Sequence, residues 1–173
     1  MLYNIIIKKI MFVNRGVEVA YMKARDIMIK EVLKVKDDST VKNVLEIFST
    51  HKISGLPVVN DRNETIGYIS DGDIMRWIGK KEPVFIDLFF VNAVFLDQES
   101  LESKFDRLVM ANVMDVAKKK IIVVEEDEEI EKVATILGNK KIKKVPVHRN
   151  GVLRGIISRG DIIRYVTKEF LKN

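Results

Sequence analysis

An internal repeat constrains the fold of this chain more than any other feature of its sequence. Residues 53–59, ISGLPVV, correspond to residues 142–148, IKKVPVH, with an offset of 89 positions. Residues 67–74, GYISDGDI, correspond to residues 155–162, GIISRGDI, with an offset of 88, and one deletion in the preceding turn accounts for the difference. Each copy spans about 55 residues, which is too short to bury a stable core alone. We therefore expect two copies that fold against each other.

Within each copy, the spacing of apolar residues predicts a strand, a helix, two more strands and a second helix. Apolar residues three and four positions apart favour helices, and short β-branched runs favour strands. The predicted strands of the first copy are residues 32–35, 56–59 and 65–69, with helices that begin after 37–40 and at Ser70 or Asp71. Those of the second copy are residues 121–124, 145–148 and 152–157, with helices after 125–129 and over 160–171. The sequence thus predicts an α/β (α+β) fold of two β-α-β-β-α units.

The rest of the chain divides around these copies. We assign residues 1–22 to an N-terminal extension, 23–78 to the first copy, 79–107 to an apolar connecting insert and 108–173 to the second copy with its C-terminal helix. The insert is the most aromatic part of the chain, so we expect it to be buried on the body or against a second subunit, with a helix over 99–108. The extension is expected to pack as a strand or helix. Translation from Met22 rather than Met1 is the alternative.

Composition excludes several classes of function. The chain has no cysteine and two histidines, so thiolate metal sites, disulfides and cysteine nucleophiles are excluded and no metal site is expected. No apolar run is long enough to span a bilayer or to serve as a secretory signal, which predicts a cytoplasmic protein without membrane attachment. The net charge of +5 favours an anionic partner without choosing among nucleotide, nucleic acid and lipid.

The two motifs in their order, repeated, resemble those of the cystathionine-β-synthase (CBS) domain. The resemblance covers residues 23–78 and 108–165, about two thirds of the chain. It implies two copies that pack sheet to sheet about a pseudo-two-fold axis, a homodimer of such pairs, and a cleft between the copies for AMP, ADP, ATP or S-adenosylmethionine. It also implies roles for the motif residues: the aspartates bind ribose, the serines bind phosphate, and strand residues around each proline hold adenine.

The same site follows in part from the residues themselves. Ser70 and Ser158 stand where a strand meets a helix, and free backbone N–H groups there attract phosphate. Asp73 and Asp161, three residues on, can accept hydrogen bonds from ribose hydroxyls. The expected apolar walls and close approaches around the base come from seven strand residues: Ile53, Gly55, Leu56, Pro57, Ile142, Val145 and Pro146.

A serine followed three residues later by an aspartate is also an ordinary helix-capping box, and this alternative stays open for both copies. Charge favours the second copy as the nucleotide site, because Arg159 there replaces Asp71, which would repel phosphate. Four lysines beside the second strand motif either face solvent or contact the ligand: Lys140, Lys141, Lys143 and Lys144.

These observations lead to a regulatory module that binds an adenosyl ligand and catalyses no reaction. The chain has no phosphate-loop motif, no zinc-protease motif and no nucleophile elbow, and no cofactor is expected. A separate protein would be the regulated partner. The alternatives are a structural or protein-docking pair, and a nucleic-acid-binding protein, although the lysines are dispersed among acidic blocks and form no known reader motif.

Overall fold

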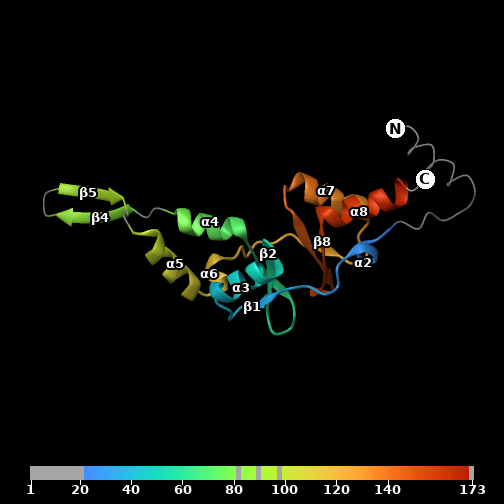
Figure 1. Ribbon diagram of the computed structural model, residues 1–173, viewed down its shortest axis with the longest axis horizontal. Coiled ribbons are helices and arrows are strands. Elements are labelled where there is room, and N and C mark those ends of the chain that lie inside the picture. Colours follow the sequence, from blue (N-terminus) through green and yellow to red (C-terminus); the bar gives the residue numbers. More distant parts are fainter. Residues whose placement is uncertain (1–21, 81–82, 89–90, 97–98, 172–173) are drawn as a thin grey trace, which may run out of the picture.

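The computed structural model describes residues 22–80, 83–88, 91–96 and 99–171. The expectation for the N-terminal extension therefore lies outside the described residues, except for Met22. Two small units make up the body (Figure 1). The first contains β1 (Val35–Lys36), α3 (Val41–His51), β2 (Gly55–Val59), β3 (Thr65–Ser70) and α4 (Asp71–Gly79). The second contains β6 (Val124–Glu125), α7 (Ile130–Asn139), β7 (Lys144–Arg149), β8 (Val152–Ser158) and α8 (Arg159–Phe170).

Each unit is built on a three-stranded sheet with one pattern of pairing. In the first, β1 runs parallel to β2 and β2 runs antiparallel to β3; β6, β7 and β8 repeat this order. Register is repeated too, since Val35 pairs with Val58 and Val124 pairs with Val147. The predicted fold of two β-α-β-β-α units is confirmed.

The first strand of each unit is shorter and later than predicted. Residues 32–35 and 121–124 were expected to be strands, but only Val35–Lys36 and Val124–Glu125 pair with a neighbour. The β-branched run that predicted the strand lies mostly before the point at which the chain joins the sheet.

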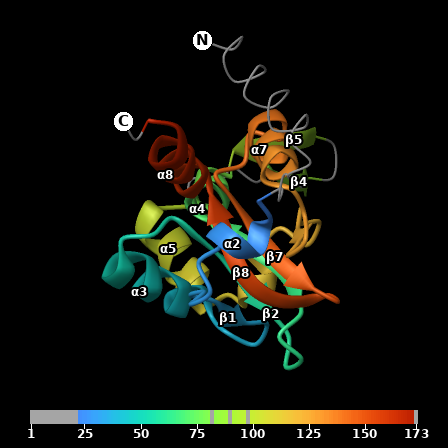
Figure 2. The same cartoon turned by 90° about the vertical axis from the view of Figure 1, so that its right-hand side faces the viewer.

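The segment that precedes each unit packs on the other one. Helix α2 (Ala24–Ile27) comes before β1, yet Ala24 is fully buried in the core of the second unit and its N–H donates to the Glu128 carbonyl at 2.8 Å. Helix α6 (Val113–Val116) comes before β6, yet Val113 is buried in the core of the first unit and donates to the Ser39 carbonyl at 2.9 Å. Figure 2 shows α2 lying across β8. The packing of α2 on the second unit and of α6 on the first thus holds the two units together.

Paired backbone bonds continue this exchange and reveal its symmetry. Ile29 and Ile156 exchange two N–H to carbonyl bonds of 3.0 Å, and Tyr68 and Lys118 exchange two more of the same length. Because Ile156 and Tyr68 occupy the same place in the repeat, Ile29 is the structural counterpart of Lys118. The sheets are thereby related by an approximate two-fold axis.

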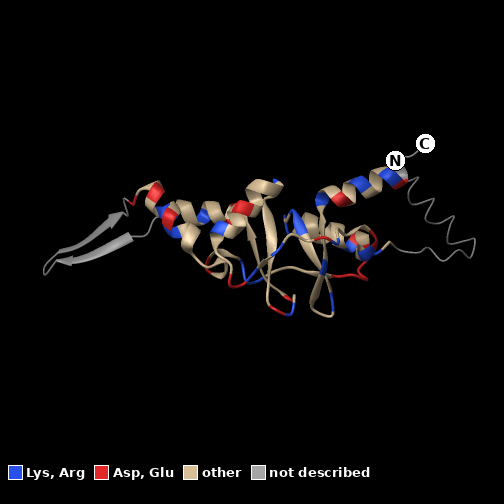
Figure 3. Cartoon of the chain, turned by 60° about the horizontal axis from the view of Figure 1, so that its bottom comes forward, with Lys and Arg blue, Asp and Glu red and all other residues tan. Residues whose placement is uncertain are grey.

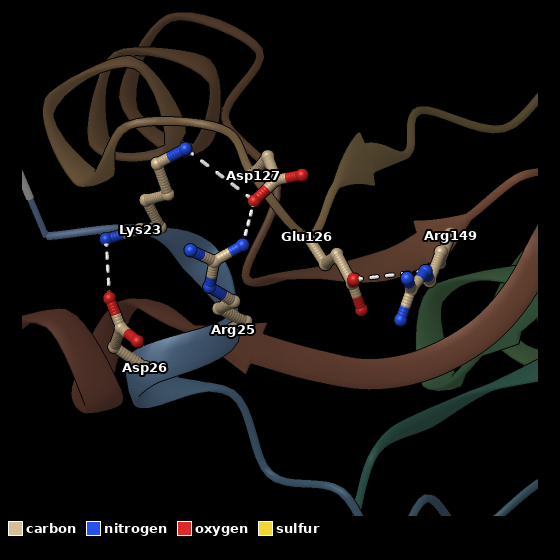
Figure 4. Close-up of polar contacts among 6 residues, drawn as sticks. All are labelled: Lys23, Arg25, Asp26, Glu126, Asp127 and Arg149. Atoms are coloured by element: carbon tan, nitrogen blue, oxygen red, sulfur yellow. Dashed lines mark hydrogen bonds and ion pairs between the residues drawn. The ribbon is translucent and has the colours of Figure 1, made fainter.

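Exposed ion pairs accompany the exchange at the second unit (Figure 4). The Lys23 ammonium lies 3.5 Å from the Asp127 carboxylate, which the Arg25 guanidinium also contacts. On the same acidic turn Glu126 lies 3.3 Å from Arg149. The acidic residues 125–129, which predicted the start of a helix, therefore also form part of the surface on which α2 packs.

A hairpin and a helix connect the units. Strands β4 (Pro83–Leu88) and β5 (Val91–Leu96) pair in antiparallel register from Pro83 with Leu96 to Leu88 with Val91, and they project beyond the body (Figure 1). Whether their apolar side chains are buried, as expected, lies outside the described residues. Helix α5 (Leu101–Met110) follows, with the Ser100 hydroxyl capping it. Within the part of the chain that the structure describes, no helix is long and apolar enough to cross a bilayer.

Candidate functional site

A cavity of about 560 Å³ opens between the units, where the N-terminus of α4 faces the chain that leads into the second sheet. The first unit contributes residues from the start of β2, the end of β3 and the first turns of α4. The second contributes residues 118–122, apart from Lys119, and residues 141–146, apart from Val145. Its size lies in the range of small-molecule sites.

Asp73 is the buried carboxylate among the residues that line this cavity, and it is 5% exposed. Its Oδ2 accepts hydrogen bonds from the Ser70 N–H at 2.9 Å and from the Ser70 hydroxyl at 2.5 Å. Its Oδ1 contacts the Arg76 guanidinium and lies 3.8 Å from the Lys118 ammonium. One oxygen therefore serves the helix cap, while the other faces cations whose side chains are more than half exposed. The capping box is formed, and it leaves Oδ1 oriented toward the exposed Arg76 and Lys118 side chains.

An apolar wall stands beside this carboxylate. Ile121, Ile122 and Ile142 line the cavity from the second unit. Tyr68 lines it from β3, and burial raises the pKa of its phenol, with the carboxylates of Asp71 and Asp73 raising it further, so the hydroxyl keeps its proton at neutral pH. A flat apolar ring and a hydrogen-bonding ligand group can both be accommodated here.

Glycine at position 55 makes room for the tyrosine. A β-carbon on Gly55 would lie 3.0 Å from both Cε1 and the hydroxyl oxygen of Tyr68. The corresponding positions in the second unit are Lys144 and Ile156, where a smaller side chain replaces the ring. The loss of glycine in the second copy is thus matched by the loss of the tyrosine.

Basic side chains also line the cavity and outnumber the acidic ones. Six basic side chains line it: Arg76, Lys118, Lys120, Lys141, Lys143 and Lys144. Two acidic ones, Asp71 and Asp73, face them. Asp71, which was expected to repel phosphate, has its carboxylate 3.9 Å from the Lys143 ammonium. The charge comparison between Asp71 and Arg159 considered each copy alone, whereas here the neighbouring cation comes from the other copy.

The cavity brings together five of the predicted site residues: Gly55, Ser70, Asp73, Ile142 and Pro146. Four others do not line it: Ile53, Leu56, Pro57 and Val145. Leu56 and Val145 are fully buried in the two cores, because alternate strand residues face opposite sides of a sheet. Ile53 packs on the first core, and Pro57 is buried in β2.

Ser158, Arg159 and Asp161 also lie outside this cavity, at the start of α8. The Asp161 carboxylate accepts from the Ser158 N–H at 2.7 Å and from its hydroxyl at 2.6 Å, and it contacts Arg164, which repeats the geometry of Asp73. The Arg159 guanidinium donates to the carbonyls of Leu137 at 2.9 Å and Ile142 at 2.8 Å. Its hydrogen bonds join α8 to the end of α7.

Sequence reasoning missed Tyr68, Arg76 and the segment that contributes Lys118, Lys120, Ile121 and Ile122. That segment lies near the start of the second copy, and spacing alone assigned its isoleucines to a strand. The available signal was the lysine run 118–120 directly before an apolar pair. Among the described residues, no group of three or more His, Asp or Glu side chains is arranged to hold a metal ion.

Comparison with known proteins identifies the fold family. A family model described as the CBS domain matches residues 24–80 and 113–168. The chain belongs to the CBS domain family. As a CBS pair, it is 32% identical over 151 residues to protein MJ1426 of Methanocaldococcus jannaschii, covering 82% of this chain and 89% of that protein. It is 27% identical to the inosine-5′-monophosphate dehydrogenase of the same organism, of which it spans 24% of the length.

Two solved structures share the architecture of this CBS pair. One is CBSX2 in complex with AMP, with a TM-score of 0.65 and 23% identity, covering 84% of this chain and 96% of that one. The other is the CBS domain pair of protein MJ0100 with 5′-methylthioadenosine and S-adenosyl-L-methionine, with a TM-score of 0.64 and 19% identity, covering 86% and 98%. At these identities the likeness establishes the fold.

Proposed function

We propose that this CBS pair is a regulatory module that binds an adenine nucleotide or related adenosyl ligand in the cavity at Asp73 and catalyses no reaction. One observation carries the proposal: a single cavity combines a carboxylate oxygen facing exposed cations, an apolar wall and a cluster of lysines. These are the groups that ribose, a purine ring and phosphate require. AMP and adenosyl compounds in two structures of the same fold support it.

In the proposed complex the ribose hydroxyls donate to Oδ1 of Asp73. Arg76 and Lys118 now face that oxygen, and their exposed side chains can move toward the phosphates without disturbing the cap on Oδ2. The base lies against Ile121, Ile122 and Ile142. Because the ligand touches both units, binding changes the free energy of their relative arrangement, which a partner protein can sense.

We also propose that the pair forms a homodimer in the cytoplasm through α4 and α8. Met75 on α4 and Ile163 on α8 occupy corresponding places in the repeat and are 61% and 64% exposed. Large apolar side chains at two symmetric positions favour a protein contact. Light scattering on the intact chain at micromolar concentration tests this, and a monomer would exclude it.

Calorimetric titration with AMP, ADP, ATP and S-adenosylmethionine tests ligand binding. The decisive variant is Asp73→Asn, which keeps an oxygen for the Ser70 cap but removes the charge, and Asp161→Asn is its matched control at the symmetric position. We expect the first to weaken binding by about tenfold or more, since hydrogen bonds to charged groups are worth about 1.5–3 kcal/mol, and the second to leave it unchanged. Equal melting temperatures show that both variants fold.

The alternatives predict other results. If the wild type binds none of the four ligands, the aspartates are helix caps in a structural or protein-docking pair. RNA binding that falls steeply with salt and that adenine nucleotides do not compete would indicate a nucleic-acid protein. Figure 3 argues against that outcome, because basic and acidic residues are interspersed on the helices, α8 included. Product formation from ATP or AMP in proportion to protein would contradict the absence of catalysis.

A further inference from the structure

We infer that the Asp73 cavity selects a nucleoside polyphosphate over a monophosphate or a sulfonium ligand, and that each chain binds one such molecule. This inference rests on the proposed function and narrows it from adenosyl ligands in general to those that carry a chain of phosphates. The charge of the cavity, and its unequal distribution between the two copies, carry the argument.

The cavity holds more positive charge than a monophosphate can neutralise. Six basic and two acidic side chains line it, an excess of four positive charges. The two carboxylates are each near a cation, Asp71 beside Lys143 and Asp73 beside Arg76 and Lys118. Lys120, Lys141 and Lys144 form no ion pair with any acidic residue of the described chain. Gathering like charges in one cavity is unfavourable unless an anion joins them.

The uncompensated lysines flank the apolar wall. Lys120 directly precedes Ile121, and Lys141 and Lys144 stand on either side of Ile142 and Lys143 in the sequence. A ligand whose base lies on the isoleucines therefore has cations within reach on two separate segments. A chain of phosphates reaches farther than a single phosphate, so it is better suited to contact both segments and the start of α4 together. S-adenosylmethionine carries a positive sulfonium and is repelled.

The fold itself does not require these lysines. The bonds of Tyr68 with Lys118 and of Ile156 with Ile29 align the two lead-in segments. On that alignment the counterparts of Lys118, Lys120, Lys143 and Lys144 are Ile29, Glu31, Ser54 and Gly55. The same architecture is thus built at the Asp161 end with an acidic residue in place of Lys120. Four of the six basic side chains of the cavity thus have no basic counterpart at the Asp161 end, whereas Arg76 corresponds to Arg164 and Lys141 to Lys52. We therefore expect one polyphosphate per chain.

Lys141 has a basic counterpart at the other end, and the two residues supply a matched control. Lys141 and its counterpart Lys52 both follow a helix in the left-handed region, with φ values of 54° and 52°, and both are exposed. Only Lys141 lines the cavity. Asparagine tolerates this conformation, so Lys141→Asn and Lys52→Asn have the same backbone cost and differ in their distance from the site.

The test is calorimetric titration of the full chain with ATP, ADP, AMP, S-adenosylmethionine and inorganic tripolyphosphate, without divalent cations that would mask the phosphates. We expect affinity to fall from ATP through ADP to AMP, with one ATP bound per chain. Among these three nucleotides, salt should weaken the binding of ATP most steeply. Lys141→Asn should weaken ATP binding by about fivefold and leave AMP binding unchanged. Lys52→Asn should leave the binding of both nucleotides unchanged. Lys120→Glu introduces the residue found at the corresponding position of the Asp161 end, Glu31. It should weaken ATP binding more than Lys141→Asn does.

Each contrary result has its own meaning. AMP or S-adenosylmethionine binding as tightly as ATP overturns this inference and leaves the proposed function standing, as do two equal ATP sites per chain. Tripolyphosphate that binds as tightly as ATP overturns the nucleoside part of the inference. Failure of all adenosyl ligands to bind overturns the inference and the proposed function together.

Discussion

The thioether of Met28 packs directly against Gly155, so closely that a β-carbon on the glycine would come within 2.5 Å of the sulfur. At Gly67, which corresponds to Gly155 in the repeat, the contact is looser, because a β-carbon there would lie 3.3 Å from the thioether sulfur of Met114. In each pair the methionine belongs to one sequence copy and the glycine to the other. The closeness of each contact therefore indicates how tightly the segment that carries the methionine packs on the other unit.

This difference predicts unequal costs of adding a methyl group. Gly155→Ala must displace Met28, whose Cβ, Cγ and Sδ all lie under 3.0 Å from the added carbon, and we expect a loss of about 1–3 kcal/mol in the free energy of unfolding. Gly67→Ala requires a shift of a few tenths of an ångström and should cost less. Urea unfolding followed by circular dichroism gives both values.

Removal of the methionine supplies the control for this pair. Met28→Ala should itself destabilise the chain, but the added cost of Gly155→Ala should nearly vanish in the double variant, because the clash is gone. Equal costs of Gly155→Ala with and without Met28 would show that the glycine is needed for another reason. Trp77, the single tryptophan, lies in the first unit, so its fluorescence reports whether that unit unfolds separately.

A second prediction concerns one polar contact between the sheets. His148 is 5% exposed, and its Nε2 lies 2.8 Å from the Thr65 hydroxyl, whereas the corresponding positions are the buried apolar residues Val59 and Leu153. Burial lowers the pKa of His148, opposed in part by Glu125. The unfolded chain takes up this proton near pH 6.5 and the folded chain only at lower pH. Stability from this residue is therefore complete above pH 6.5 and decreases as the pH falls toward the folded pKa.

The symmetric positions provide the variant that tests this. The double substitution His148→Val with Thr65→Leu copies the pair found at the other side and leaves no group to titrate. Its free energy of unfolding should fall less than that of the wild type between about pH 7.5 and about pH 5.5. His51→Gln, at the exposed end of α3, should keep the wild-type dependence. Identical pH dependence in the wild type and the double variant would rule out His148 as the source.

A third prediction separates core packing from charge in holding α2. The Asp127 carboxylate and the Arg25 guanidinium it contacts are 60% and 47% exposed, so Asp127→Asn should lower stability by less than about 1 kcal/mol, and less still at high salt. Ala24 is fully buried in the second core. Ala24→Asp should cost several times more, because it places an unpaired charge there. Similar losses in the two variants, measured by urea unfolding, would contradict this order.

The sequence was sufficient to predict the two units. It was not sufficient to predict that the segment before each unit packs on the other one. The caps at Thr40, Ser70 and Ser158 stand at strand-to-helix boundaries that composition and periodicity specify locally. Helix α2 has only four residues, so nothing local indicates which core it joins. The cavity depends on the equivalent exchange of α6, because the chain that follows α6 places Lys118 and Lys120 opposite Asp73 although they belong to the second copy.

A fourth prediction addresses Arg159, which sequence reasoning proposed as a phosphate contact. Its guanidinium donates to two carbonyls, one on α7 and one at Ile142 before β7. Arg159→Met leaves those carbonyls without that donor, and we expect a loss of about 1 kcal/mol in the free energy of unfolding. ATP affinity should be unchanged, because Arg159 does not line the cavity. Urea unfolding and calorimetry on one preparation measure both quantities. Unchanged stability with weakened ATP binding would instead assign Arg159 to the ligand, as the sequence first indicated.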